Sequence, residues 1–439
     1  MGNQIFYQDQ AVIMSRNIAR REFFQQLVLG GAAWGGLPYL VPRGVLAAPG
    51  KPGVNDTVNI ALVGAGVRAR QIATNLPAAC RIVAICDVEL PKTHSLQRAL
   101  NRRWNAYQDY RRLLEKETVE GVLFCNCDHN RILPAIHACQ AGKDIYVEKP
   151  FSLYVTEGRA LVRAVQHYGR ICQTGTQART IGTNQAALRL VRDGKLGKLK
   201  SIVCRNYGSL PAYQGGPAQP VPVGLNWDMW CGQTEMFPYN EAPHRRWSTF
   251  INYCGGGVTF LGAHAYDMIQ CALGTDETGP AELWTTGPAG PGAPVRMKYA
   301  GGFEVSLEGD DKSTPFVGAI FTCEHGKIEL NEHLFRSNPK VLAAQVPGME
   351  KGEVGYRPGW MGTSHIANWI DCIKTRKRPH AYEEIGHRSA TVCHLVNIAK
   401  RLGRRLQWDP AAERFVNDEE ANRQLDRPRR KGFDLPTIG

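Results

Sequence analysis

The 439-residue sequence has no low-complexity tract, and beyond residue 48 it has no apolar run long enough to cross a membrane. Hydrophobic residues make up 43% of the chain and charged residues 21%, which are the proportions of a folded globular protein. These features exclude a largely disordered chain. The length is sufficient for two domains, each with its own core.

Nucleic-acid-binding motifs are also absent, although the formal net charge is +13. Lysine and arginine are spread along the chain, and clusters such as Arg429, Arg430 and Lys431 are short. Dispersed charge is typical of a solvated basic surface rather than of a face that binds DNA or RNA. We therefore expect no nucleic-acid partner.

The 13 cysteines show no spacing that is typical of a metal site. Cys125 and Cys127 are close in sequence, but a single residue between them is not zinc-finger spacing. Others, such as Cys86 and Cys323, lie in apolar stretches, where a thiol acts as a small hydrophobic side chain. The sequence predicts neither a disulfide framework nor a metal centre.

The N-terminus has the organisation of an export signal. Arg20 and Arg21 precede an uncharged apolar run, residues 23–40, that is rich in glycine and alanine. This order is typical of a secretory signal, and the paired arginines indicate the twin-arginine route. We predict a twin-arginine signal at residues 1–48 and a linker at 49–56, with export to the periplasm by the twin-arginine machinery. The alternative is a cytoplasmic protein whose apolar N-terminus is an ordinary helix.

Strands and helices alternate after this linker. Short apolar runs that predict buried strands lie at residues 58–63, 81–86, 121–125, 144–147 and 170–173. Helical segments, such as 132–141 and 156–167, lie between them. The alternation predicts an α/β fold that begins with a Rossmann domain, residues 57–177, on a doubly wound parallel sheet.

Residues 178–439 show consecutive strands instead. Strand patterns occur at 200–207, 282–286, 295–299, 303–307, 317–323 and 327–330, and helix patterns at 184–193, 364–375 and 383–402. They predict an α/β domain with a mainly antiparallel open sheet. The tail after Leu425, rich in arginine and proline, is interpreted as an arm that packs on a neighbouring subunit.

A glycine-containing turn joins the first strand to a helix. Gly64 permits a tight turn, and Gly66 allows the backbone to approach a pyrophosphate. Ala69 is small enough for close packing of the helix on the strand, and Val67 and Arg68 open the helix whose N-terminus favours negative charge. The turn therefore predicts a dinucleotide site.

An acidic residue stands where such a site needs one. Asp87 ends the second strand, 23 positions after Gly64 (87 − 64), and is expected to accept hydrogen bonds from the adenosine ribose. A carboxylate there would repel a ribose 2′-phosphate. We expect NAD or NADP as cofactor, with NAD weakly favoured.

The ends of later strands supply further polar side chains. Lys149 follows the fourth strand, at the edge where ligands bind in such sheets, and can transfer a proton beside a nicotinamide. Asn126, His129, Glu148 and Gln177 also follow strands, and we predict that they line the cofactor site together with Lys149.

Several separated motifs resemble one known family. They are GKDIYVEKP at 142–150, QTGTQ at 173–177, GGG at 255–257, GAHAYD at 262–267, HIAN at 365–368 and WDP at 408–410. Their order is similar to that in the glucose–fructose oxidoreductase, inositol dehydrogenase and rhizopine-catabolism (Gfo/Idh/MocA) family. The resemblance implies a Rossmann domain, a C-terminal substrate-binding domain, and a homo-oligomer built through its open sheet.

The resemblance also implies catalytic residues. It places the family's catalytic lysine at Lys149 and its catalytic histidine at His264. A histidine can accept the proton of an alcohol, and a lysine can stabilise the alkoxide while hydride leaves. Asp267, one helical turn after His264, is expected to orient it.

The expected substrate is a sugar or polyol. We predict that a long aromatic and polar stretch of the sequence binds the substrate. The predicted substrate-binding residues are Trp227, Asp228, Tyr239, His244 and Arg246. A structural cover is the alternative role for this stretch.

Two departures from the family's pattern leave the reaction type open. Phe260 stands where many relatives have aspartate, and the loop at 126–131 lacks their proline and second histidine. An oxidoreductase is favoured. A hydrolase, lyase or epimerase that oxidises its substrate transiently is one alternative, and a sugar-binding sensor without turnover is another.

Overall fold

The structure is a computed structural model that describes residues 53, 56–309, 314–331, 333–346 and 363–438. The predicted signal at 1–48 lies outside the described residues, as does most of the predicted linker. No helix within the described ranges is long and apolar enough to span a bilayer.

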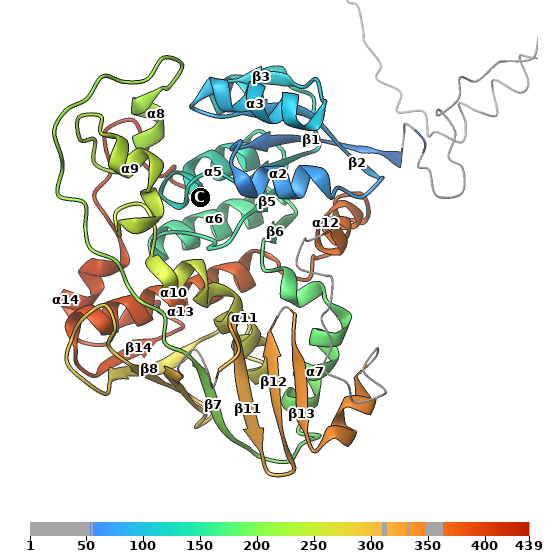
Figure 1. The fold of residues 1–439 in the computed structure, drawn as a ribbon, viewed down its shortest axis with the longest axis vertical. Coiled ribbons are helices and arrows are strands. Elements are labelled where there is room, and N and C mark those ends of the chain that lie inside the picture. Colours follow the sequence, from blue (N-terminus) through green and yellow to red (C-terminus); the bar gives the residue numbers. More distant parts are fainter. Residues whose placement is uncertain (1–52, 54–55, 310–313, 332, 347–362, 439) are drawn as a thin grey trace, which may run out of the picture.

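The first domain contains a six-stranded parallel sheet (Figure 1). Its strands are β1 (Val58–Val63), β2 (Cys80–Cys86), β3 (Asn105–Tyr107), β4 (Gly121–Phe124), β5 (Asp144–Val147) and β6 (Cys172–Thr174). Their spatial order, β3-β2-β1-β4-β5-β6, is that of a Rossmann fold. The predicted doubly wound sheet is confirmed, and β3 is a strand that the sequence analysis missed.

Helices from both halves of the chain cover this sheet. They are α2 (Val67–Thr74), α3 (Leu90–Leu100), α4 (Tyr110–Lys116), α5 (Ile132–Gln140) and α6 (Val155–His167), together with α12 (Thr363–Thr375) from far along the chain. Trp369 of α12 packs with Ile60, Leu62 and Tyr146 of the sheet in one buried cluster. A Cβ atom at Gly121 would lie 2.9 Å from the Trp369 ring, so glycine there permits this packing.

The second domain contains a nine-stranded sheet, in the order β13-β12-β11-β7-β10-β9-β8-β14-β15. The strands are β7 (Leu199–Arg205), β8 (Pro280–Thr285), β9 (Val295–Tyr299), β10 (Glu304–Gly309), β11 (Gly318–Cys323), β12 (Gly326–Asn331), β13 (Phe335–Asn338), β14 (Leu406–Asp409) and β15 (Arg414–Phe415). Among the described strands of this second sheet, only β7 and β10 pair in parallel, which confirms the mainly antiparallel sheet.

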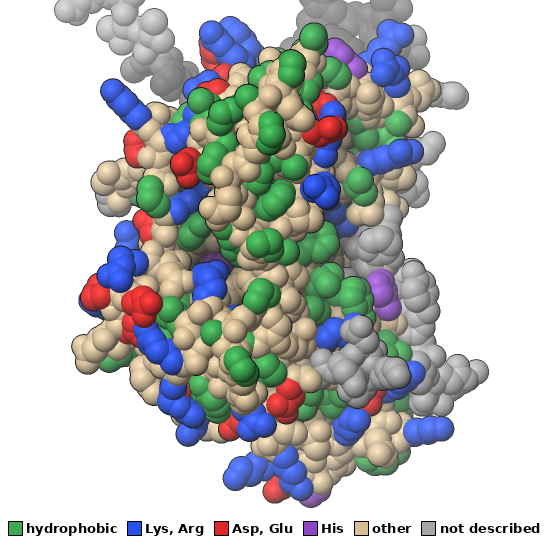
Figure 2. All heavy atoms as spheres, turned by 60° about the vertical axis from the view of Figure 1, so that its left-hand side comes forward, with side chains coloured by type: hydrophobic (Ala, Val, Ile, Leu, Met, Phe, Trp, Pro, Cys, Tyr) green, Lys and Arg blue, Asp and Glu red, His purple; other side chains and the backbone are tan. Residues whose placement is uncertain are grey.

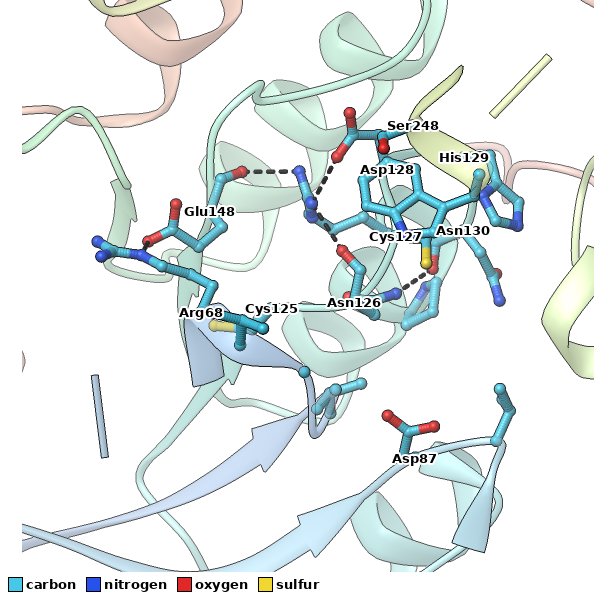
Figure 3. A pocket seen from close by; sticks show the side chains of 18 of the residues that line it. Arg68, Asp87, Cys125, Asn126, Cys127, Asp128, His129, Asn130, Glu148 and Ser248 are labelled. Atoms are coloured by element: carbon cyan, nitrogen blue, oxygen red, sulfur yellow. Dashed lines mark hydrogen bonds and ion pairs between the residues drawn. The ribbon is translucent and has the colours of Figure 1, made fainter. Parts of the chain in front are cut away.

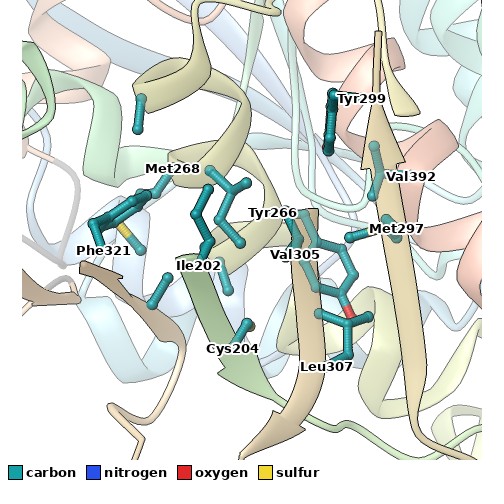
Figure 4. Close-up of a cluster of buried hydrophobic side chains, with 14 of the residues drawn as sticks. Ile202, Cys204, Tyr266, Met268, Met297, Tyr299, Val305, Leu307, Phe321 and Val392 are labelled. Carbon is teal, nitrogen blue, oxygen red and sulfur yellow. The ribbon is translucent and has the colours of Figure 1, made fainter. Parts of the chain in front are cut away.

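The helices of this domain are α7 (Gly182–Arg192), α8 (Trp227–Cys231), α9 (Glu241–Arg245), α10 (Gly256–Phe260), α11 (Gly262–Leu273), α13 (Glu383–Leu402) and α14 (Glu419–Asn422). Alternate side chains of the sheet, such as Ile202 and Phe321, pack against α11 and α13 in the largest buried cluster (Figure 4). This packing fixes α11, which carries His264, against the core.

A long segment, residues 206–254, leaves β7 and crosses to the first domain, where α8 and α9 lie (Figure 1). The Gly224 carbonyl accepts hydrogen bonds from Leu90 N (2.9 Å) and Gln108 Nε2 (2.8 Å), and Asn226 N donates to the Val88 carbonyl (2.8 Å). The segment is therefore attached at the end of β2, next to Asp87.

The charged side chains of the face shown in Figure 2 are dispersed. Lysine and arginine are spread over it with aspartate and glutamate among them, rather than gathered in one basic patch (Figure 2). That distribution is typical of a solvated surface.

Candidate active site

A cavity of about 630 Å³ opens at the carboxyl ends of the Rossmann strands, with walls from both domains. Its size is in the usual range for a small-molecule site. The cavity brings together these predicted site residues: Gly64, Gly66, Val67, Arg68, Asp87, Asn126, His129, Glu148, Lys149, Gln177 and His264. Residues more than a hundred positions apart thus meet at one edge of the sheet.

The glycine turn has the geometry of a phosphate-binding turn. Gly64 has φ +95°, and a Cβ atom there would lie 2.6 Å from the Asn126 backbone nitrogen. A Cβ atom at Gly66 would meet nothing within 4 Å, so the space above this residue is open to a ligand. Ala69 does not line the cavity but is fully buried against the sheet. These features fit a pyrophosphate at the N-terminus of α2.

Asp87 is fixed by the backbone at the end of β2. Its Oδ2 accepts a hydrogen bond from Ala65 N (2.8 Å), and its Oδ1 accepts one from Glu89 N (2.9 Å). Burial raises the pKa of the Asp87 carboxyl above its ordinary value, although these hydrogen bonds oppose the shift. The carboxylate lines the cavity, in the position that suits ribose hydroxyls.

A buried network surrounds Glu148, next to Lys149 (Figure 3). Arg68 Nε donates to Glu148 Oε1 at 2.7 Å, and Gln177 Nε2 donates to the same oxygen at 3.2 Å. Burial alone would raise the pKa of Glu148, but the charge and hydrogen bond of Arg68, together with the charges of Lys149 and Arg131, outweigh it and lower that pKa. A Cβ atom at Gly175 would lie 2.7 Å from Glu148 Oε2, so the QTGTQ motif leaves room for this carboxylate.

The loop after β4 carries Asn126 and His129 into the cavity wall. His129 is 1% exposed, and its Nε2 lies 2.7 Å from the Trp230 carbonyl oxygen, as a donor in the neutral ring. Burial lowers the pKa of His129 to about 3, so the ring is neutral near pH 7. Asn126 Nδ2 donates to the Asn130 carbonyl. The buried Oδ1 of Asn126 has no hydrogen-bond partner among the described residues.

Lys149 and His264 approach the cavity from different domains. Lys149 Nζ donates to the Phe260 carbonyl oxygen (2.7 Å) and lies 4.2 Å from the centre of the Phe260 ring. His264 lies in the first turn of α11, at the same cavity. A cationic lysine and a titratable imidazole at one cavity can act on a substrate hydroxyl.

Asp267 does not have the place that was expected for it. Its carboxylate is fully buried and accepts hydrogen bonds from Arg179 Nε (2.8 and 2.9 Å) and from Ser389 Oγ (2.8 Å). It does not line the cavity. The helical spacing to His264 is correct, but the nearby Arg179 binds the carboxylate more strongly than an imidazole would. Asp267 therefore anchors α11 to the core.

The residues predicted to bind substrate are also placed elsewhere. The cavity is not lined by Trp227, Asp228, Tyr239, His244 or Arg246. Trp227, Tyr239 and His244 pack together in a small aromatic cluster, in which the Tyr239 hydroxyl lies 3.2 Å from His244 Nδ1. Asp228 forms an ion pair with Arg430 (2.7 Å), and Arg246 is exposed. The aromatic stretch is thus mostly a core of its own.

Neighbours of that cluster line the cavity instead. Met229, Trp230, Trp247 and Ser248 from the crossing segment face it, as does Phe260, which is 47% exposed. Trp230 stacks on Trp227 (4.5 Å between ring centres). Composition alone could not separate the tryptophan that lines the cavity from the one that supports it.

The C-terminal tail, predicted to be an arm that packs on a neighbouring subunit, makes extensive contacts with its own chain. Arg427 Nε donates to Glu157 (2.7 Å), and its Nη2 donates to the His129 carbonyl (2.6 Å). Arg430 donates to the Gly232 carbonyl (2.9 Å). The tail therefore joins α6, the His129 loop and the crossing segment.

Two family models match the chain. Residues 58–176 match the NAD-binding Rossmann fold of the Gfo/Idh/MocA oxidoreductase family, and residues 212–435 match that family's C-terminal alpha/beta domain. The second match alone covers more than half of the chain.

Curated relatives match over part of their length. The chain is 28% identical over 226 residues to scyllo-inositol 2-dehydrogenase (NAD(+)) from Bacillus subtilis, which covers 50% of this chain and 55% of that protein. It is 28% identical over 145 residues to 2,7-anhydro-N-acetylneuraminate hydratase from Mediterraneibacter gnavus, covering 33% of this chain and 38% of that protein.

Solved structures share the fold at low sequence identity. Myo-inositol 2-dehydrogenase from Lactobacillus plantarum is 15% identical with a TM-score of 0.57, over 80% of this chain and 99% of that one. Aldose-aldose oxidoreductase from Caulobacter crescentus, complexed with glycerol, is 17% identical with a TM-score of 0.56, over 80% and 99%. With both family models matched in order along one fold, this chain belongs to the Gfo/Idh/MocA oxidoreductase family and carries that family's NAD-binding Rossmann domain.

Proposed function

We propose that this protein oxidises a CH–OH group of a sugar or polyol by hydride transfer to NAD or NADP. The observation that carries the proposal is the shared cavity, which places Lys149 and His264 at the same edge of the sheet as Gly66 and Asp87. The inositol dehydrogenases among the relatives support a cyclitol or related polyol as substrate.

The residues of the first domain fit the dinucleotide. Gly66 leaves space for the pyrophosphate, and Asp87 offers its carboxylate to the adenosine ribose. The oxidised nicotinamide, when bound, would supply the hydride acceptor. His264 would accept the proton of the substrate hydroxyl, and Lys149 would stabilise the alkoxide oxygen.

Variants of Lys149 and His264 test these roles. We expect Lys149→Met and His264→Asn each to lower the rate at which the polyol substrate is oxidised by roughly 10²–10⁴-fold, because each variant removes a proton-transfer or charge-stabilising group. The affinity for NAD, measured by fluorescence titration, should change little. A variant with wild-type turnover would refute the role of that residue.

A redox-neutral reaction is the second candidate function. The residue at position 260, beside Lys149, is a phenylalanine rather than an aspartate. One relative is named as a hydratase. Such an enzyme would oxidise its substrate and reduce it again on one bound cofactor. Product formation without a net change in NADH absorbance would favour this candidate over a dehydrogenase.

We also propose that the protein is exported through the twin-arginine route and keeps its cofactor. The Arg20-Arg21 pair supports export of a folded protein, and the hydrogen bonds that attach the crossing segment beside Asp87 support slow release of the dinucleotide. Cell fractionation, followed by an assay of nicotinamide released on denaturation, tests both parts. Intact protein confined to the cytoplasm would refute export, and an exported pool without nicotinamide would refute retention.

A homo-oligomer is the proposed assembly. The family resemblance supports pairing through the open sheet of the second domain. Light scattering coupled to size exclusion measures the mass, and a monomer at micromolar concentration would contradict the proposal.

A further inference from the structure

Asp128 is a buried carboxylate at the cavity that no step above uses. It is 2% exposed and begins the short turn Asp128–Asn130 after β4. Its Oδ1 accepts a hydrogen bond from Arg131 Nη2 at 2.9 Å. Its Oδ2 is also buried and accepts no hydrogen bond from an N–H or O–H group of the residues that the structure describes, so the Cys254 thiol is the further donor that interacts with this carboxylate.

The other two carboxylates at the cavity are already bound by the protein. Both oxygens of Asp87 accept backbone hydrogen bonds. Glu148 accepts from Arg68, Gln177 and Lys149 N. Asp87 is also the acceptor proposed for the adenosine ribose, so Asp128 is the acidic residue of the cavity lining that is left for the substrate.

The surroundings of Asp128 place it on the substrate side. Burial raises the pKa of its carboxyl, and the charges of Arg131 and Lys149 oppose that shift, so Lys149 lies within electrostatic reach. The thiol of Cys254, just before α10, is hydrogen-bonded to Asp128, and burial together with the Asp128 charge raises the pKa of that thiol. Asp128 thus lies near Lys149, the residue proposed to stabilise the alkoxide, and where the second domain closes the cavity.

A buried carboxylate is energetically costly unless its oxygens accept good hydrogen bonds, and a thiol is only a weak donor. A substrate hydroxyl would relieve that cost better. The hydrogen bond of a hydroxyl to an ionised carboxylate is short and strong compared with one to a neutral acceptor. A sugar or cyclitol carries several hydroxyls around the carbon that is oxidised.

We propose that Asp128 is a specificity-determining residue that accepts, at Oδ2, a hydrogen bond from a hydroxyl of the polyol substrate other than the one oxidised. This assignment rests on the proposed function. It narrows the substrate class to compounds that bear a second hydroxyl close to the reacting carbon. Arg131 holds the other oxygen and so fixes the direction in which the carboxylate accepts.

Binding to the enzyme loaded with NADH tests the proposal without turnover. The probes are myo-inositol, scyllo-inositol, glucose and monodeoxy derivatives of each ligand that binds, followed by tryptophan and NADH fluorescence. We expect Asp128→Ala to raise the Kd of the best ligand by about 10- to 150-fold, the scale of a lost hydrogen bond to a charged group. Asp128→Asn keeps the side-chain size and an acceptor, and should give a smaller increase.

The deoxy derivatives separate a direct contact from a structural effect. In the wild type, one deoxy derivative should bind much more weakly than its parent, whereas Asp128→Ala should bind the two alike. Asp144→Asn is the matched control, because Asp144 is also buried and paired with an arginine, Arg376, but does not line the cavity. The control should keep the wild-type discrimination between parent and deoxy ligand.

Each other outcome overturns the assignment. Equal Kd values in the wild type and Asp128→Ala would show that Asp128 binds no hydroxyl. A loss of NADH affinity would assign Asp128 to the cofactor, and a lower kcat at unchanged Kd would assign it to proton transfer. If the wild type oxidises a polyol but Asp128→Ala distinguishes the parent ligand from its deoxy derivative as the wild type does, only the assignment of Asp128 fails. If the wild type binds none of the probes, the proposed function fails with it.

Discussion

Arg68 Nε and Glu148 Oε1, 2.7 Å apart, join the helix after the glycine turn to the strand end that carries Lys149. The Glu148 side chain is almost completely buried, and Gln177 and Gly175 of the QTGTQ motif complete its surroundings. Two motifs that are separate in sequence are therefore parts of one network. That network fixes the backbone at Lys149 relative to the phosphate-binding turn.

The two glycines of the turn should respond differently to alanine. Gly64→Ala should lower the free energy of unfolding by roughly 1–3 kcal/mol, because the residue has φ +95° and the new methyl would meet the Asn126 backbone. Gly66→Ala should leave stability within about 0.5 kcal/mol of the wild type. Gly66→Ala should nevertheless raise the Kd for NAD by about tenfold or more, because the new methyl group occupies the space above the turn. Urea denaturation and NAD titration measure the two effects, and a stable Gly66→Ala variant with wild-type affinity would contradict the phosphate assignment.

Asp87→Ala should weaken NAD binding by about 1–3 kcal/mol, since a charged acceptor of ribose hydroxyls is lost.

Asp87 also affects how the stability of the protein depends on pH. Burial raises its folded-state pKa, so the folded protein holds this proton more tightly than the unfolded chain does. The contribution of Asp87 to stability is therefore present at low pH and lost as pH rises through the raised pKa. In Asp87→Asn that part of the pH dependence should disappear from denaturation curves measured between pH 3 and 7, and an unchanged profile would argue against the shift.

Arg427→Met should destabilise the protein by about 3–5 kcal/mol, because the buried Glu157 would lose its nearer cation, at 2.7 Å, and keep only Arg429, at 3.9 Å. The double variant Arg427→Met/Glu157→Gln should be less destabilised than the sum of its single variants. Lys431→Met, an exposed position in the same tail, serves as the control and should change stability by less than about 0.5 kcal/mol.

The same variants test how the tail packs. Because its contacts lie within one chain, the loss in Arg427→Met should be equal at two protein concentrations tenfold apart. A loss that grows on dilution would instead show an arm that packs on another subunit.

Lys400 provides a test at alkaline pH. It is 0% exposed, and its Nζ donates to Asn206 Oδ1 (2.6 Å) and to the Ala293 carbonyl (2.5 Å). Burial lowers the pKa of Lys400 from 10.5 to about 8. Between these pH values the unfolded chain binds the proton more tightly, so the free energy of unfolding should increase as pH rises, by on the order of 3 kcal/mol in total. Lys400→Met should lack that increase. If the free energy of unfolding changed with pH in the same way in both proteins, the lowered pKa of Lys400 would be refuted.

The parts of the site that could be predicted from sequence are those set by local geometry. Gly64, Gly66 and Asp87 occupy fixed positions around a strand–turn–helix unit, and Lys149 follows a buried strand, so their meeting at one sheet edge follows from the topology. Whether Phe260 and His264 line the cavity depends on how the second domain docks on the first. For His264 the family resemblance supplied that information.

The parts that were missed depend on long-range packing. Trp227 and Trp230 lie three residues apart on α8, and only the packed structure shows that the second lines the cavity while the first supports it. Asp128 is one residue away from the predicted His129, but only the hydrogen bonds of the structure show that its Oδ2 accepts from no N–H or O–H group of the described residues. The strand β3 is three residues long and partly exposed, so its apolar pattern is weak.

The position of α12 on the first sheet affects how the protein folds during synthesis. Ile366, Trp369 and Ile370 cover the same sheet face as Ile60 and Leu62, yet α12 ends about 200 residues after β6 (375 − 174 = 201). At the usual rate of translation this interval lasts roughly 10 to 40 s. During that time the dinucleotide-binding turn can form while the part of this sheet face that α12 covers is still exposed. An isolated fragment of residues 57–177 would keep that part of the face exposed permanently, so it should aggregate rather than fold as an independent nucleotide-binding domain.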